Sequence, residues 1–313
     1  MFRISRTIPI FVISKMTSPD HILTAVNRFD ALFRESDIGN YYLSIQTGDT
    51  GFSFCVLDGT TQKYIGIGDL KLPATKGPGS REIRLSFEAF LSRVLVSVPY
   101  LQKPFKSCRI IWEGNKSTLV PNTLFEESAK ERFLSFNQPV DPHEIVLQDP
   151  LRDHQAVNVF AVPEQANRLL LKHFPAGQVR HHVSVLLQSL FLNYRNQITR
   201  PKIFIHFREP WFDLIVLEPH KLVYANMFEF KQAEDMVYYL LFAIEQLGMH
   251  ADRSEAVLLG RISRNTPVYN LIARYIRKME FAQRNPAWQY SFVFNEIPPH
   301  TYYPLINLNQ CGL

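Results

Sequence analysis

Residues 45–58, IQTGDTGFSFCVLD, align without a gap on residues 205–218, IHFREPWFDLIVLE, at an offset (45 to 205) of 160 residues. The same offset continues into the next apolar run, where it pairs Tyr64 with Tyr224. In each copy, short apolar runs are separated by turn residues, a pattern typical of an antiparallel strand meander. Because an internal repeat of this kind decides the architecture, we predict two related α/β halves that face each other across a cleft.

In both halves a helix and then a buried strand are predicted to follow the meander. The two helices have apolar residues at helical spacing and occupy residues 86–100 and 233–247. The two strands are CRIIW at 108–112 and EAVLL at 255–259. Between the halves the pattern predicts, in order, a strand, a helix, a strand and a short helix, at 157–163, 164–174, 179–186 and 187–195.

Length and composition fit two packed domains, because 313 residues with 46% hydrophobic content exceed one ordinary core. Prolines and acidic residues interrupt the periodicity over residues 136–154, which places the break near there. Aromatic residues alternate at strand period over 288–294 and predict a core strand. We therefore expect a flexible or mis-started N-terminus at 1–20, a first domain at 21–155, a second domain at 156–287, and a C-terminal strand and tail at 288–313 that closes onto the body.

Charge and cysteine usage indicate the class of protein. The formal net charge is only +5 and the basic residues are dispersed, which argues against a nucleic-acid partner. The three cysteines are far apart and fit no metal or disulfide spacing, so a reducing, cytoplasmic compartment is expected. The apolar run IPIFVI at 8–13 is too short to span a bilayer, so no transmembrane segment is predicted.

The familiar catalytic motifs are missing from the sequence. It contains no GxGxxG loop, P-loop, zinc spacing or nucleophile elbow, so no catalytic residue is predicted. His181 and His182 are expected to open a strand with side chains on opposite faces, both partly exposed. That geometry is poor for a shared metal ion, and no metal site is expected.

The order of elements resembles the actin-like ATPase fold, built from duplicated ribonuclease H-like domains with mixed sheets flanked by helices. Over roughly residues 35–313 the chain looks most like a bacterial family of unknown function that carries this fold. More distantly, it is similar to the actin-like proteins of type IV pilus and type II secretion machines. The segments that carry the resemblance are LSIQTGDTGFSFCVLD at 43–58, STLVP at 117–121, AVNVFAVP at 156–163 and YYPLINL at 302–308.

The resemblance implies a phosphate-binding turn in each meander. Actin-like ATPases place an Asp at the end of the first strand and a Gly two positions later, and the carboxylates hold Mg²⁺ through water. At these positions the first copy has Gln46 and Gly48, and the second has His206 and Arg208. Both carboxylates and one glycine are therefore missing, and we interpret the motif as degenerate.

The adenosine-binding element of the family, a strand that runs into a glycine pair, matches LLGR at 258–261, where Gly260 is followed by Arg261. An alternative stays open, because Asp49 (next to Thr50) and Glu209 are equivalent positions at the two turn tips. Two such carboxylates could bind a cation, and Arg208 or Arg261 could meet a phosphate. Ordinary turn chemistry explains Asp49 and Glu209 equally well.

Two functions remain compatible with the sequence. The first is a protein of unknown physiological role that acts as a non-catalytic protein-binding or scaffold module, with a protein partner and no cofactor. The alternative is a divergent nucleotide-binding ATPase or small-molecule kinase that uses the interdomain cleft, with ATP and magnesium as ligands.

Overall fold

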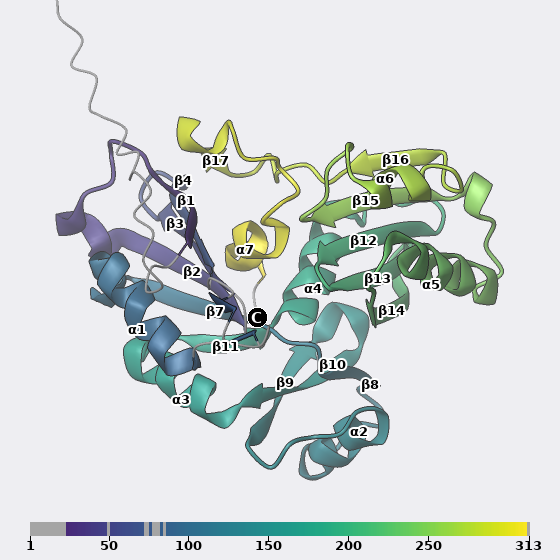
Figure 1. The fold of residues 1–313 in the computed structure, drawn as a ribbon, viewed down its shortest axis with the longest axis horizontal. Helices are drawn as coiled ribbons and strands as arrows, with labels where there is room; N and C mark the ends of the chain where they lie inside the picture. The colour runs from purple at the N-terminus through teal and green to yellow at the C-terminus, as the bar shows by residue number, and fades with distance from the viewer. Residues whose placement is uncertain (1–22, 49–50, 72–74, 77–81, 84–85, 312–313) are drawn as a thin grey trace, which may run out of the picture.

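The two meanders lie in two separate sheets, one in each body of the molecule (Figure 1). The computed structural model describes residues 23–48, 51–71, 75–76, 82–83 and 86–311. The predictions for residues 1–20, Asp49 and Thr50 fall outside these ranges. Within the described residues, no helix combines the length and apolar character needed to cross a membrane.

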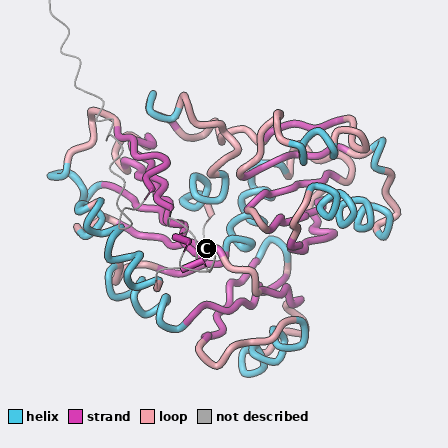
Figure 2. The backbone as a smooth tube through the Cα atoms, in the orientation of Figure 1, coloured by secondary structure: helices cyan, strands magenta, loops and turns pink. Residues whose placement is uncertain are grey.

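The first sheet contains the first meander and is extended by strands from later in the chain. Its strands are drawn in magenta in the left half of Figure 2. Its order is β1 (Leu23–Phe29), β4 (Lys63–Lys71), β3 (Gly51–Asp58), β2 (Tyr41–Gly48), β7 (Ser107–Glu113) and β11 (Gln178–His181), with β17 (Gln289–Tyr290) paired to β4. The second sheet is ordered β14 (Lys221–Glu229), β13 (Trp211–Glu218), β12 (Lys202–Arg208), β15 (Glu255–Gly260) and β16 (Lys278–Phe281).

Two smaller sheets complete the strands. A three-stranded sheet has the order β8 (Ser117–Pro121), β10 (Ala156–Pro163) and β9 (Glu144–Leu151), and β5 (Thr75–Lys76) pairs with β6 (Glu82–Ile83). The helices are α1 (Phe87–Ser97), α2 (Lys130–Asn137), α3 (Glu164–His173), α4 (His182–Tyr194), α5 (Ala233–Gln246), α6 (Pro267–Ile272) and α7 (Tyr303–Asn307).

The paired strands confirm the offset of the repeat across its first hairpin. Thr47 lies opposite Phe52, and the equivalent Phe207 lies opposite Phe212. The offset does not continue into the third strand, because the turn that follows β13 is two residues shorter than the turn that follows β3. Tyr224 therefore lies opposite Val216, a position that matches Gly66 in the first meander, and the predicted pairing with Tyr64 is wrong.

Helices cover both faces of the second sheet. Side chains of α5 pack with one face and side chains of α4 with the other. In the first body, α1 and α3 pack on one face of the sheet. The other face is covered by the C-terminal tail, whose α7 lies between the two bodies and contacts both β2 and α4 (Figure 1).

Three sequence-based boundaries need correction. The break predicted between residues 155 and 156 falls inside the β9–β10 hairpin, and β11 then joins the first sheet, so the first body extends to His181. The strand predicted at 179–186 ends at His181, because an apolar run buried on all sides forms α4 instead. The core strand predicted at 288–294 is only two residues long and continues as a 3-10 helix, Phe292–Phe294.

Candidate functional site

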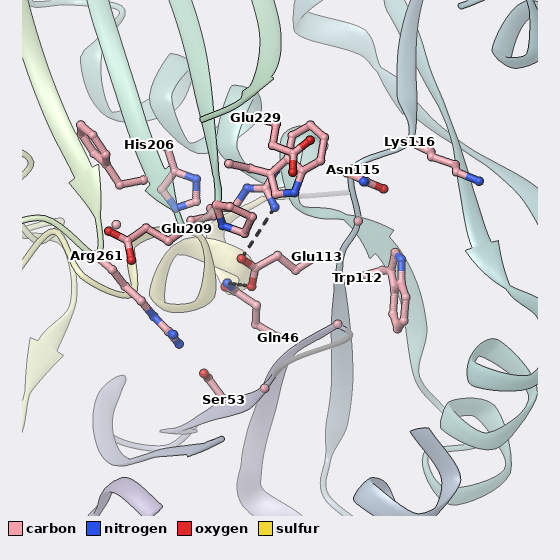
Figure 3. Close-up of a pocket in the computed structure, with 18 of the residues that line it drawn as sticks. Gln46, Ser53, Trp112, Glu113, Asn115, Lys116, His206, Glu209, Glu229 and Arg261 are labelled. Carbon is pink, nitrogen blue, oxygen red and sulfur yellow. Dashed lines mark hydrogen bonds and ion pairs between the residues drawn. The ribbon is translucent and has the colours of Figure 1, made fainter. Parts of the chain in front are cut away.

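A cleft with a volume of about 800 Å³ lies between the two bodies (Figure 3). Its walls come from both meanders, from the ends of β7 and β15, and from the tail. Among the residues singled out in the sequence, those that line it are Gln46, Gly48, His206, Arg208, Glu209, Gly260 and Arg261. The structure therefore brings together the sequence-predicted positions that it describes.

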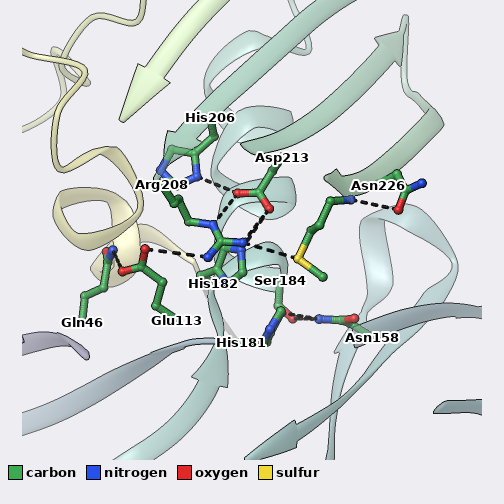
Figure 4. A network of polar contacts seen from close by, with 11 residues as sticks. Gln46, Glu113, Asn158, His181, His182, Ser184, His206, Arg208, Asp213 and Asn226 are labelled. Atoms are coloured by element: carbon green, nitrogen blue, oxygen red, sulfur yellow. Dashed lines mark hydrogen bonds and ion pairs between the residues drawn. The ribbon is translucent and has the colours of Figure 1, made fainter. Parts of the chain in front are cut away.

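Arg208 lies at the centre of a buried polar network (Figure 4). Its side chain is only 5% exposed, and its Nε and Nη2 donate to Asp213 over 3.0 and 3.2 Å. Burial by itself raises the pKa of Asp213, but Arg208 and the neighbouring histidines hold it well below the ordinary value. Asp213 is thus a carboxylate that is fully engaged inside the protein.

The network crosses from one body to the other through Glu113, at the end of β7. Arg208 Nη1 lies 3.8 Å from Glu113 Oε1, and Gln46 Nε2 donates to Glu113 Oε2 over 2.9 Å. Desolvation opposes ionisation of Glu113, yet Arg208 and then Gln46 lower its pKa. Gln46, which stands where the resemblance places the first magnesium-binding Asp, therefore binds a carboxylate of its own chain.

Two histidines complete the network around Asp213. His206 Nδ1 lies 2.8 Å and His182 Nε2 lies 3.1 Å from the Asp213 carboxylate, and each must donate because a carboxylate only accepts. Within the described part of the chain, His182 Nδ1 is buried without a partner. Burial and then Arg208 lower the pKa of His182, so its neutral form is favoured.

His181 is buried as well, so the prediction that both histidines are partly exposed is wrong. Its backbone N–H donates to Asp149 over 2.9 Å, and Arg180 Nη1 donates to the same carboxylate over 3.1 Å. Burial and then the neighbouring His182 hold the pKa of His181 well below the ordinary value. Among the described residues, no cluster of three or more His, Cys, Asp or Glu side chains has the geometry to hold a metal ion.

The surviving glycines of the cleft are required by backbone packing. A Cβ on Gly48 would lie 2.7 Å from the Glu113 carbonyl oxygen. Gly260 has φ +81°, and a Cβ there would lie 2.2 Å from the Phe207 carbonyl oxygen. The N–H groups of Gly260 and Arg261 already donate to the carbonyl oxygens of His300 (2.8 Å) and Phe207 (3.0 Å).

A second polar cluster links the cleft wall to the tail through Asp69 on β4. Ser53 Oγ donates to this buried carboxylate over 2.7 Å and Tyr302 Oη over 2.9 Å. Arg261 Nη2, whose side chain is 46% exposed, approaches it at 3.4 Å. Asp69 therefore ties the first meander to two segments that follow the second one.

Sequence reasoning missed the acidic partners Asp213, Asp69 and Glu113. Each of them interrupts or ends a strongly apolar strand: WFDLIVLE, KYIGIGDLK and SCRIIWE. A carboxylate in such a position is almost never buried without a partner. This signal was present in the sequence and could have identified a buried charge network.

The two α/β bodies with repeated meanders define the class of protein: this is the actin-like ATPase fold. A solved structure from Bacteroides thetaiotaomicron, of a protein with this fold and unknown function, matches 90% of this chain and 100% of its own at 23% identity and a TM-score of 0.73. A PilM–PilN type IV pilus biogenesis complex matches 86% of this chain and 97% of its own, at 11% identity and a TM-score of 0.60. Residues 30–279 match the family described as "Protein of unknown function (DUF3822)", and the chain belongs to that family. A comparison with curated proteins gave no match.

Proposed function

We propose that this chain is a non-catalytic, protein-binding module with an actin-like fold, whose cleft has lost the ability to bind a nucleotide. The observation that carries the proposal is Arg208. Its guanidinium is held by Asp213 and faces Glu113 at the position where the resemblance places a phosphate-binding glycine. A side chain there keeps the backbone N–H groups of the turn away from a ligand.

The rest of the cleft supports the same proposal. Gln46 offers a neutral amide and His206 a ring nitrogen where Mg²⁺ prefers carboxylate oxygens. The N–H groups at Gly260 and Arg261 are already used by carbonyl oxygens. A triphosphate would therefore have to displace existing hydrogen bonds before it gained its own.

The similarity to the structure of a PilM–PilN complex supports a protein partner, because that solved relative is itself a protein–protein assembly. Its sequence identity to this chain is low, so the nature of the partner has to be argued from the surface of this chain. We further propose a reducing, cytoplasmic location, which fits three buried cysteines without disulfides.

Isothermal titration with ATP and ADP, each with Mg²⁺, tests the proposal. We expect no binding tighter than about 1 mM, which corresponds to about −4 kcal/mol, and no hydrolysis. Tripolyphosphate serves as the control for unspecific binding of anions at Arg261. Micromolar affinity for Mg-ATP that disappears in Asp49→Ala or Glu209→Ala would refute it.

The second candidate is a divergent nucleotide-binding enzyme. The observation in its favour is the cleft itself, which keeps a volume of about 800 Å³ and is lined by Lys71, Lys116 and Arg261. ATP and magnesium are its ligands under this alternative, and the same titration decides between the two.

A further inference from the structure

The outer face of α5 presents aromatic side chains to solvent. Glu234, Tyr238, Phe242 and Glu245, which we call the α5 stripe, follow one another at spacings that place them on one side of the helix. Tyr238 is 64% exposed and Phe242 is 51% exposed, and both glutamates are exposed as well. Large aromatic residues side by side on a surface mark an interaction site.

Ring contacts hold the stripe in place. The Tyr238 ring stacks on Phe242 with centroids 6.2 Å apart and meets Tyr239 edge-on at 5.5 Å. Tyr239 in turn stacks on Phe228 at 5.0 Å, and Phe228 stacks on the buried Phe212 at 5.3 Å. The exposed rings are therefore connected to the core, which reduces the conformational entropy that a partner would have to remove.

A groove continues the stripe at the C-terminal end of α5. It has a volume of about 380 Å³ and shares Glu245 with the stripe. Its walls include the apolar Leu241, Ile244 and Met249, the charged Asp252 and Arg274, and Tyr275. Tyr275 is 43% exposed, so the aromatic surface extends from the helix to the rim of the groove.

The charge of this surface is opposite to that of the chain. Helix α5 holds three carboxylates and no basic residue, and Asp252 adds a fourth in the groove. The basic residues beside them are Arg274 in the groove and Lys231, which lies just before the helix next to Asp235. The chain as a whole carries a formal net charge of +5. Lysine and arginine bind both to carboxylates and to the faces of exposed aromatic rings. A negatively charged lipid surface is disfavoured by the same carboxylates.

We propose that the α5 stripe and its groove dock a basic amphipathic helix of a partner protein. Apolar residues of that helix, spaced three or four apart, pack against Tyr238 and Phe242, and one of them enters the groove. Its lysines and arginines lie beside Glu234 and Glu245. This inference rests on the proposed protein-binding role, but the surface covers the outer side of α5 and contains none of the residues that line the cleft.

Site-specific crosslinking in the native cell tests the proposal. Tyr238 is replaced by the photo-crosslinking amino acid p-benzoylphenylalanine, and Phe136 on α2, which is 89% exposed, is replaced in the same way as a control. We expect the Tyr238 site alone to capture a segment rich in lysine and arginine with apolar residues at helical spacing. The charge reversal Glu234→Lys with Glu245→Lys should abolish this product.

A synthetic peptide of the captured segment then binds the purified full chain, and Phe242→Ser weakens that binding at least about tenfold. Added salt weakens it further, whereas Phe136→Ser leaves it unchanged. These side chains are exposed, and an unchanged thermal midpoint verifies that each variant is folded. An acidic or neutral segment, a crosslink to a second copy of this chain, identical products at both sites, or no product at Tyr238 would each overturn the proposal. Tight nucleotide binding in the cleft would contradict only the proposed loss of the nucleotide site.

Discussion

Replacement of Asp213 by asparagine should strongly destabilise the protein. The Asp213 carboxylate accepts from Arg208 twice, from His206 and from His182, over 2.8 to 3.2 Å. The amide of the variant would keep one acceptor oxygen but lose the charge, so Arg208 would remain buried with only Glu113 at 3.8 Å. Breaking a buried ion pair from one side costs about 3–5 kcal/mol. We expect the thermal midpoint to fall by roughly 10 °C.

The assay is thermal unfolding followed by circular dichroism, with Glu113→Gln as the matched control. The Glu113 side chain is 30% exposed and its contact with Arg208 is long, so we expect a loss of at most about 1 kcal/mol there. The double variant Arg208→Met with Asp213→Asn should lose less than the two single losses together, because it leaves no unpaired charge buried. A loss in Asp213→Asn no greater than in the Glu113 control would refute this account of the network.

Three further predictions concern the backbone, the contact between the bodies, and pH. Gly260→Ala should lower the free energy of unfolding in urea titrations by about 2 kcal/mol or more, because φ is +81° and the added Cβ would meet a carbonyl oxygen. Gly39→Ala is the control, because a Cβ there meets open space and the variant should be nearly neutral. Tyr302→Phe removes one hydrogen bond to Asp69 and should lower the free energy of unfolding by about 1 kcal/mol. If Tyr302→Phe costs the same in a protein that already carries Asp69→Asn, the hydrogen bond is not the cause of the loss. Because the folded chain lowers the pKa of His182, the unfolded chain binds more protons, and stability should fall as the pH falls below the ordinary value of 6.5. The loss of stability with falling pH should be shallower in His182→Gln, and an unchanged pH dependence would contradict the role given to His182.

Local patterns in the sequence predict most of the elements correctly. The helix expected at 233–247 is observed at Ala233–Gln246, and the strand expected at 255–259 is observed at Glu255–Gly260. Both depend on interactions close in sequence, including the capping box of Gln232 and Asp235 at the start of α5. Such signals are readable without knowledge of the tertiary fold.

Features that depend on distant contacts were not predictable in the same way. The extension of the first body to His181 follows from the pairing of β11 with β7, which are about 70 residues apart in the chain, a separation over which local patterns carry no information. In α4, ten of 13 residues are buried, so periodicity could not separate a helix from a strand there. The predicted site positions that the structure describes line one cleft, but their acidic partners come from other strands and were missed.

The two meanders use equivalent positions for polar residues, and the contacts of these residues support the proposal that the cleft binds no nucleotide. Gln46 lies opposite Ser53 on the first hairpin, and His206 lies opposite Asp213 on the second. In the first body Gln46 bonds to Glu113 and Ser53 bonds to Asp69. In the second body His206 and Asp213 bond to each other, and Asp213 also bonds to Arg208. A ligand that recruited them would have to break contacts that stabilise the fold and to leave Arg208 or Asp213 without its partner. The free energy of those contacts therefore opposes binding in the cleft, and the same residues that hold the two bodies together argue for a partner that binds elsewhere on the surface.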